Sequence, residues 1–341
     1  TAQLRASRRQ AFHSAVGHVV EVFSNLFPIW TVAAAAFALH QPSAFAFMST
    51  DYFTAALSML MFSMGVTLTF KDVQRVFNNP IPVAINVSAC YILMPLLAYG
   101  LAQFFALPPA YTAGLVMVGA INGGQSSNLC TFIARGDVAL SVLMTTSTTI
   151  ACTFMTPLMA YWLLGAIVPV DAVGIAESVL QIIMVPAFAG VLLNKFLPSV
   201  TRIVKMFSPI IGIVATILLV GASVGKAAPA LVGGGMALHL PCILLHFLGG
   251  LGGYMMCHLA GLGERVARTT AIETAMKSSA FVFLLCGLHF SDYMVAVPCA
   301  VSVVWNAIIG STMAVIWRFI PYVDVHGDGP QDEAEPLVED K

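Results

Sequence analysis

Charged residues are scarce in this chain of 341 residues, and their scarcity decides its class. Asp, Glu, Lys and Arg together make up 9% of the sequence, where soluble domains contain about 25%. Hydrophobic residues make up 59%, and the mean hydropathy is +0.89. A soluble fold of this length cannot bury so much apolar surface. We therefore expect an all-α polytopic membrane protein, with the lipid bilayer as its main partner.

The chain also lacks the residue patterns of catalytic and nucleic-acid-binding sites. No nucleophile–base pair, phosphate-binding glycine loop or basic patch is visible, so we expect neither an enzyme nor a nucleic acid partner. His239 and His246 could share a helix face, but no third metal ligand is evident. The seven cysteines stand singly in apolar stretches, which predicts small buried residues and no disulfides.

Apolar stretches long enough to cross a bilayer recur along the chain. A membrane helix needs about 20 mostly apolar residues. The sequence predicts ten such helices, at residues 19–39, 50–69, 81–105, 110–134, 138–165, 172–194, 207–225, 231–259, 266–288 and 291–317.

The basic residues indicate how these helices are oriented. Apart from Lys226, Lys277 and Lys341, every Lys and Arg falls before the first predicted helix or in a loop on the same side. This asymmetry predicts that both termini lie on the cytosol-equivalent side. Residues 1–18 form a basic segment that is compatible with the end of a cleaved transit peptide. Residues 320–341 form an acidic tail that we expect to be disordered.

Ten helices divide evenly into two repeats of five. Because five is odd, the second repeat would cross the membrane upside down relative to the first. The predicted repeats are residues 19–165 and 172–317. The sequence contains a faint echo of this symmetry, since Ala-Ile-Asn at 120–122 resembles Ala-Ile-Glu at 271–273.

The apolar pattern breaks at matching places in the two halves. The breaks are INGGQSSN at 121–128 and AIETAMKSS at 271–279, and each lies within a predicted membrane helix. Polar, helix-loosening residues at membrane depth, once in each half, are the best sequence indicator of a transporter's binding site. We therefore expect an ion or ligand site at these breaks.

Glu273 is the central residue of the second break. Insertion scales put the cost of a mid-bilayer acid at about 2.5–3.5 kcal/mol, so it needs a partner. The candidate partners are a metal ion, a proton, or Lys277 one helical turn further on, in which case the pair would be purely structural. Neutral oxygens are available from Ser127, Asn128, Ser141 and Thr145.

One carboxylate with several neutral oxygens favours a single hard monovalent cation such as Na⁺, whereas Ca²⁺ sites usually contain more carboxylates. Hydroxyl groups at helical spacing also often bond to the preceding turn, which is the alternative for Ser141 and Thr145.

Gly123 and Gly124 can free the backbone from helical geometry at the first break. A half-helix beginning near Gln125 would then direct N–H groups towards a cavity, where they favour a small carboxylate. The predicted substrate contacts are Gln125, Ser126, Ser278 and Asn306, although Asn306 could instead be a packing contact.

At these motifs the chain resembles the bile acid:sodium symporter family. The resemblance covers nearly all of 19–318 and is most specific at 121–148, at 271–279 and at FSMGVTLT (62–69). It is closest to the plastid-envelope branch of plants and algae. The resemblance implies ten helices in two inverted five-helix repeats. Helices 1, 2, 6 and 7 would form a panel domain, and helices 3–5 and 8–10 a core domain in which broken helices 4 and 9 cross.

The resemblance also implies a first sodium site. The family builds it from a Ser-Asn pair on helix 4, a Ser and a Thr on helix 5, and a Glu on helix 9. All five residue types are preserved here, as Ser127, Asn128, Ser141, Thr145 and Glu273.

The implied second sodium site departs from the family pattern. It would share Glu273 and use backbone oxygens near Thr274 and Met276, together with two glutamines. Those glutamines correspond here to Cys90 and Lys277. We hypothesise one Na⁺ per cycle, with Lys277 as a built-in surrogate for the second ion or an anchor for the substrate carboxylate.

These features predict a sodium-coupled secondary transporter of a small organic anion, such as a 2-oxo acid or a pantoate-like molecule. The resemblance implies the plastid inner envelope, with the plasma membrane as the alternative. A proton-coupled or uncoupled anion carrier would use Glu273 as a proton site. A receptor or sensor that binds an anion without moving it is a further alternative. The sequence says nothing of oligomeric state.

Overall fold

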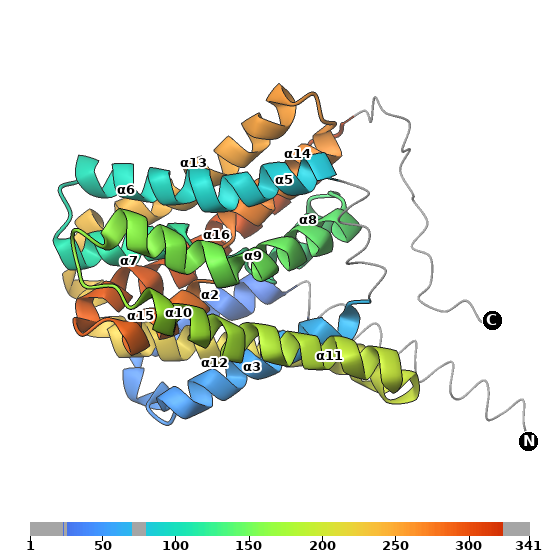
Figure 1. Ribbon diagram of the computed structural model, residues 1–341, viewed down its shortest axis with the longest axis horizontal. Coiled ribbons are helices and arrows are strands. Elements are labelled where there is room, and N and C mark those ends of the chain that lie inside the picture. The colour runs from blue at the N-terminus through green and yellow to red at the C-terminus, as the bar shows by residue number, and fades with distance from the viewer. Residues whose placement is uncertain (1–22, 24–25, 70–79, 323–341) are drawn as a thin grey trace, which may run out of the picture.

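The computed structural model describes residue 23, residues 26–69 and residues 80–322 (Figure 1). Within these ranges every regular element is a helix, and the strand-like pairing is a single bridge between Gly123 and Lys277. The expected all-α class is therefore confirmed for this part of the chain. The expectations for residues 1–18 and for the acidic tail beyond 322 lie outside the described residues.

The helices divide between the two predicted halves of the chain. The first half contains α2 (Phe27–His40), α3 (Thr50–Thr67), α5 (Pro80–Ser88), α6 (Met94–Phe104), α7 (Pro109–Gly119), α8 (Ser127–Ile133) and α9 (Val138–Leu164). The second half contains α10 (Ala172–Val179), α11 (Val185–Phe196), α12 (Pro198–Gly233), α13 (Gly235–Leu259), α14 (Glu264–Ala275), α15 (Ser279–His289) and α16 (Ala296–Phe319). Short 3-10 turns lie at Pro42–Phe45 (η1) and Tyr293–Val295 (η4), and π-helical turns lie at Ala89–Leu93 (η2) and Leu180–Met184 (η3).

Several helices are long and apolar enough to cross a bilayer. Among the described residues there are six, namely Pro80–Phe104, Val138–Leu164, Ala172–Phe196, Ile210–Gly233, Gly235–Leu259 and Tyr293–Phe319. Shorter apolar helices lie at Phe27–His40, Pro109–Gly119 and Ser279–His289. The helices support a multi-pass membrane protein, whereas the ten-helix inverted repeat remains a prediction.

One predicted loop is wrong. The residues around Arg202 and Lys205 do not connect two helices, because α12 runs without a break from Pro198 to Gly233 and also includes Lys226. The turn that follows lies at Gly235, whose φ of +54° is readily adopted by glycine. Hydropathy marks the apolar part of a helix, but backbone hydrogen bonding carries the helix on into its polar ends.

Arg268 was counted among the basic residues beside the loop that precedes the predicted helix at 266–288, and the structure places it inside α14. Its side chain is only 1% exposed. Its Nε lies 2.8 Å from Oε1 of Glu264, and its Nη1 donates to the Trp317 carbonyl at 2.9 Å. The guanidinium also lies over the Tyr322 ring, 4.5 Å from its centroid. Arg268 therefore joins α14 to the end of α16.

The helices pack in two groups that face each other. α3, α11 and α12 lie together along the lower side of Figure 1, and α5, α6, α9 and α13 lie along the upper side. α3 approaches α11 closely because Gly65 faces Ala187, where an added Cβ would lie 2.0 Å from the Ala187 carbonyl oxygen. The division into a panel and a core domain remains a prediction.

Both predicted breaks interrupt their helices. α7 ends at Gly119 and α8 starts at Ser127, while α14 ends at Ala275 and α15 starts at Ser279. None of these four helices is long enough to cross a membrane by itself. The free backbone groups between them need partners, and each break supplies them to the other.

Candidate functional site

The two breaks cross as antiparallel backbone segments. The Gly124 amide donates to the Met276 carbonyl at 2.8 Å, and the Ser278 amide donates to the Asn122 carbonyl at 3.0 Å. This pair of hydrogen bonds satisfies backbone groups that the broken helices leave unpaired. The crossing therefore brings residues about 150 positions apart into one site inside the helical core.

Glycine is required at the crossing by close approach. A Cβ at Gly123 would lie 2.9 Å from Oε2 of Glu273, and a Cβ at Gly124 would lie 2.9 Å from the Lys277 carbonyl oxygen. Both values are shorter than ordinary van der Waals contact. The sequence predicted that these glycines loosen the helix, and the structure adds that they leave room for the opposite break.

Glu273 is fully buried and accepts hydrogen bonds from three hydroxyl groups. Oε1 accepts from Ser127 at 2.6 Å, from Ser141 at 2.5 Å and from Thr145 at 2.9 Å. Thr145 also lies 3.0 Å from Oε2. Residues from α8, α9 and α14 thus surround one carboxylate, and the hydroxyls of Ser141 and Thr145 do more than bond to their own helix.

Asn128 follows Ser127 on α8 but makes no hydrogen bond to Glu273. Its Nδ2 donates to the Gln125 carbonyl at 3.2 Å. Its Oδ1 is buried and has no hydrogen-bond partner among the described residues. A buried oxygen without a donor is costly, so Asn128 Oδ1 is suited to an electropositive ligand such as a metal ion.

The oxygen atoms around Glu273 fit a hard monovalent cation. They comprise one carboxylate, three hydroxyl oxygens and the nearby amide of Asn128, with no sulfur or imidazole among the groups bonded to Glu273. Each hydroxyl oxygen can turn its lone pairs towards a cation. A single negative charge suits Na⁺ better than a divalent ion.

Lys277 lies two residues beyond the end of α14 and does not form an ion pair with Glu273. No ion pair within 4 Å joins these two described residues. Instead, the Lys277 ammonium donates to the carbonyls of Ile121 at 3.1 Å and Cys90 at 3.3 Å. The internal ion pair that the four-residue spacing allowed does not form, because α14 ends at Ala275 before it reaches Lys277.

The Cys90 carbonyl is available to Lys277 because of a local π-helical turn. Within Ala89–Leu93, backbone bonds are made five residues apart, and the Met94 amide donates to the Ala89 carbonyl. The next residue in that register, Pro95, has no N–H to give to Cys90. Position 90 therefore contributes its carbonyl oxygen, and its thiol lies 3.9 Å from Asn86 Oδ1.

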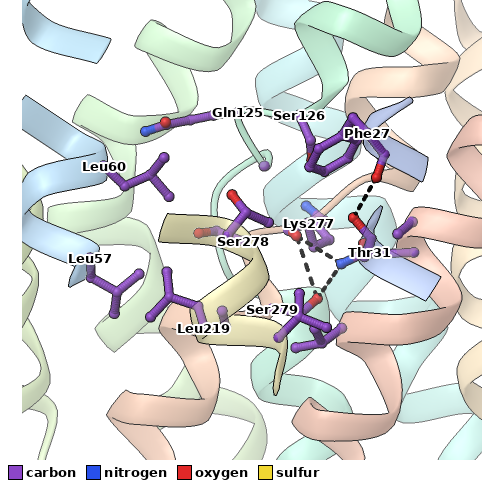
Figure 2. A pocket seen from close by; sticks show the side chains of 17 residues that line it. Phe27, Thr31, Leu57, Leu60, Gln125, Ser126, Leu219, Lys277, Ser278 and Ser279 are labelled. Carbon is purple, nitrogen blue, oxygen red and sulfur yellow. Dashed lines mark hydrogen bonds between the residues drawn. The ribbon is translucent and has the colours of Figure 1, made fainter. Parts of the chain in front are cut away.

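A cavity of about 60 Å³ lies between the crossing and the facing helices (Figure 2). The four predicted substrate contacts, Gln125, Ser126, Ser278 and Asn306, all line it, and so do Lys277 and Ser279. The opposite wall is apolar and comes from α2, α3 and α12, with Phe27, Leu57, Leu60 and Leu219. Such a space suits a molecule of a few carbon atoms that has one polar end.

The sequence also matches a known family of membrane proteins. The model of the sodium bile acid symporter family matches residues 54–233, which is more than half of the chain. The chain belongs to this family.

Curated plant proteins of the family are similar over most of the chain. The probable sodium/metabolite cotransporter BASS2, chloroplastic, of Oryza sativa subsp. japonica is 41% identical over 88% of this chain and 72% of its own length. BASS1, chloroplastic, of Arabidopsis thaliana is 36% identical over 92% of this chain and 79% of its own length. BASS3, chloroplastic, of Oryza sativa subsp. japonica is 35% identical over 89% and 72%.

These similarities place the chain among sodium-coupled transporters and not among enzymes. They confirm the family that the two break motifs indicated. The chloroplastic relatives and the membrane-spanning helices together agree with a multi-pass protein of a plastid membrane.

The residues assigned to the degenerate second sodium site of this family are partly engaged elsewhere. The Met276 carbonyl accepts from the Gly124 amide, and the Thr274 hydroxyl donates to the Thr270 carbonyl at 2.8 Å. Only Lys277 and Cys90 meet directly, through ammonium and carbonyl. The carbonyls that accept hydrogen bonds from this ammonium are therefore those of Cys90 and Ile121.

Sequence reasoning missed a buried hydrogen-bond chain behind the crossing. His246 on α13 contacts the Ala275 carbonyl through Nδ1 and the Ser302 hydroxyl through Nε2, both at 2.7 Å. Ser302 Oγ lies 2.7 Å from Ser279 Oγ, which accepts from Asn306 at 2.6 Å. His246 thus holds the end of α14, a role that only an isolated histidine in an apolar helix hinted at.

Asn306 makes the packing contact that was one expected alternative, and its role as a substrate contact remains a prediction. It lines the cavity, and its Nδ2 also donates to the Lys277 carbonyl at 2.9 Å. Thr131 is another residue that the sequence did not single out, and it donates to Ser141 Oγ at 3.2 Å. Thr148 accepts a long hydrogen bond of 3.4 Å from the Gly123 amide. The run of hydroxyl residues at 145–149 was the available signal.

Proposed function

We propose that this protein is a Na⁺-coupled symporter of a small monocarboxylate, such as a 2-oxo acid or a pantoate-like molecule, that works by alternating access. The observation that carries the proposal is the buried Glu273 carboxylate, which three hydroxyl groups from two other helices surround at the helix crossing. A lone buried acid without a basic partner is retained for an ion or a proton.

Na⁺ is the first cargo in this mechanism. Ser127, Asn128, Ser141, Thr145 and Glu273 would hold it with oxygen atoms alone. The ion neutralises Glu273 and ties α8, α9 and α14 together, because each of these helices contributes a ligand. Binding of the ion therefore stabilises the crossing that forms one wall of the cavity.

The carboxylate substrate would bind in the cavity beside the crossing. Gln125 and Ser126 approach it from the first break, and Ser278 and Asn306 from the second side. Amide and hydroxyl groups of this kind donate hydrogen bonds to a carboxylate. The apolar wall from Leu57, Leu60 and Leu219 would accept the aliphatic end, and the small volume favours short acids.

Lys277 is proposed to act as a resident cation in place of a second sodium ion. Its ammonium donates to two backbone carbonyls and to none of the three hydroxyl groups that contact Glu273. A fixed positive charge there supplies the electrostatic stabilisation that a second ion would bring. One Na⁺ would then move with each substrate, so uptake should depend on Na⁺ with a Hill coefficient near one.

The architecture proposed for this cycle is ten membrane helices in two inverted repeats, residues 19–165 and 172–317. The core would move against the panel to expose the cavity to either side. The chloroplastic relatives support the plastid inner envelope as the membrane in which this happens.

The test is uptake of labelled small carboxylates into proteoliposomes, with an inward Na⁺ gradient and a matched K⁺ gradient as the control. Na⁺-stimulated uptake that Glu273→Ala abolishes would establish the proposal. Uptake that follows a pH gradient and ignores Na⁺ would replace it with a proton-coupled carrier. Binding without uptake or exchange would replace it with a receptor.

A further inference from the structure

A second cavity lies between α3, α12 and α15, at the end of the molecule opposite most of the basic residues. Its volume is about 210 Å³, and its wall includes Thr50, Phe53, Lys226, Phe283, Leu288 and Tyr293. The wall is therefore mainly aromatic and aliphatic, with one cationic group. We call this space the outer chamber.

Lys226 is an unusual residue in this place. Among the described basic side chains, Arg135, Lys195, Arg265 and Arg318 lie at helix ends on the other side of the molecule. The Lys226 ammonium lies over the Phe53 ring, 5.7 Å from its centroid. No described carboxylate lies within 4 Å of it. Lys226 is an exposed residue, and it thus places a positive charge without a described carboxylate partner beside the apolar wall of the chamber.

The outer chamber and the cavity at the crossing share their helices. Val220 of α12 lines the inner cavity, and Lys226 of the same helix lines the outer chamber, about 9 Å further along the axis. A shift of four residues, about 6 Å along the axis, relates Leu57 to Phe53 on α3 and Ala280 to Leu284 on α15. The two spaces therefore follow one another along the contact between the two helix groups.

Two aromatic rings in the wall of the outer chamber pack against each other. Phe53 of α3 and Phe283 of α15 have ring centroids 5.9 Å apart. Both side chains are buried. Phe53 belongs to α3 and Phe283 to α15, so a movement of α3 against α15 would separate the rings.

We propose that the outer chamber is a second binding site for a carboxylate with an apolar body, in which the Lys226 ammonium binds the carboxylate and the aromatic wall contacts the rest. This site would capture substrate at the Lys226 end before the Phe53–Phe283 pair opens. The proposal rests on the proposed transport function for its role in the cycle, but binding at the site does not depend on it.

Binding is tested with a reporter thiol in the chamber. The seven native cysteines are buried, so a Leu288→Cys variant offers one reactive thiol, since Leu288 is 46% exposed. Its reaction with an anionic and with a cationic methanethiosulfonate is timed in detergent, with and without phenylpyruvate as the probe. We expect the anionic reagent to react faster, and phenylpyruvate to protect the thiol.

Three variants in this background separate charge from structure. Lys226→Gln should slow the anionic reagent and raise the phenylpyruvate concentration for half protection about tenfold, because one charge-assisted hydrogen bond is lost. Lys226→Arg should stay within about twofold of the parent. Lys195→Gln is the matched control, since Lys195 also lies over a ring, Phe196, at the opposite end, and it should have no effect.

The results also separate this site from the proposed function. Glu273→Ala should abolish Na⁺-driven uptake and leave protection of the thiol intact. The outer site would be overturned, even if uptake is normal, by either of two results. In the first, phenylpyruvate does not protect the thiol, and in the second it protects the thiol equally in the parent and in Lys226→Gln. In nanodiscs, labelling that changes with phosphatidylglycerol but not with phenylpyruvate would assign Lys226 to a lipid headgroup and would also overturn the proposal.

Discussion

The helix crossing holds one acidic and one basic group, and it holds them in different ways. Glu273 is surrounded by side-chain hydroxyls from Ser127, Ser141 and Thr145. Lys277 is held by the backbone carbonyls of Cys90 and Ile121. The two charges belong to one broken helix, yet they face separate surroundings and do not form an ion pair.

This difference indicates whether the cation at each of these two places can be exchanged. Hydroxyl groups rotate, so the Glu273 side can turn from donating to a carboxylate to coordinating a cation. Backbone carbonyls that are fixed by a π-helical turn and a helix end cannot rotate in this way. The Glu273 side is therefore suited to an ion that comes and goes, and the Lys277 side to a cation that stays.

The largest effect is expected when the negative charge of Glu273 is removed. Glu273→Gln keeps the shape but loses the negative charge, so Na⁺ binding should fall at least about 100-fold because several charge-assisted contacts are lost. The measurement is Na⁺-driven uptake in proteoliposomes. Glu177→Gln on α10, where the side chain is exposed, is the matched control and should transport normally.

Removal of the base should have the next largest effect. Lys277→Met leaves the carbonyls of Cys90 and Ile121 without a donor, at a cost of about 1–3 kcal/mol for each, so the melting temperature should fall. Lys277→Gln restores a donor and should raise the Hill coefficient for Na⁺ above that of the parent. A parent protein whose Hill coefficient is already near two would contradict the role of Lys277 as a resident cation.

A methyl group at the crossing should weaken the acidic side without changing its chemistry. Gly123→Ala puts a Cβ 2.9 Å from Oε2 of Glu273, so the carboxylate has to shift. We expect the Na⁺ concentration for half-maximal uptake to rise about tenfold. Gly100→Ala on α6 is the control, because a Cβ there meets nothing within 4 Å. Equal effects of the two variants would argue against a tight crossing.

Removal of one hydroxyl group tests how much each oxygen around Glu273 contributes to Na⁺ binding. Thr145→Val keeps the shape but removes one oxygen, and we expect about a tenfold weaker Na⁺ dependence. Thr131→Val removes a hydroxyl that contacts Ser141 and not Glu273, so its effect should be smaller. Titration of uptake against Na⁺ distinguishes the two. The reverse order would mean that Thr145 only bonds to its own helix.

The smallest effect is expected for a variant that tests whether Cys90 acts through its backbone carbonyl or through its thiol. Cys90→Ala removes the thiol but keeps the backbone oxygen that Lys277 contacts. Uptake and Na⁺ dependence should therefore remain within about twofold of the parent, as expected for a small buried residue. A large loss of activity would show that the thiol itself acts at the second site.

Most of the residues around Glu273 could be predicted from the sequence. A carboxylate inside an apolar helix costs free energy in a bilayer, and clustered glycines and hydroxyls are unusual there. Ser141 and Thr145 were named by spacing and by the family resemblance, and the structure brings both to Glu273. The partners of Lys277 were not predictable in the same way. Every residue has a carbonyl, and only the fold shows which ones are left without a donor.

The helix boundaries and the buried hydrogen bonds of His246 could not be predicted from the sequence either. Hydropathy located the apolar part of α12 but not its start at Pro198, because residues outside the bilayer continue the helix. The sequence suggested His246 only as an unsupported metal ligand and did not single out Ser302. Their contact at 2.7 Å depends on how α13 and α16 pack, which no local pattern states.

The sequence by itself determined that this protein is an all-helical membrane transporter with two polar breaks. Its composition excludes a soluble fold, and charged groups are costly in a bilayer unless they serve a function. Only the tertiary structure decided that the breaks pair with each other, that Glu273 and Lys277 stand apart, and that Lys226 borders a second cavity. These results depend on distances between segments far apart in the chain, and such distances arise only when the helices pack.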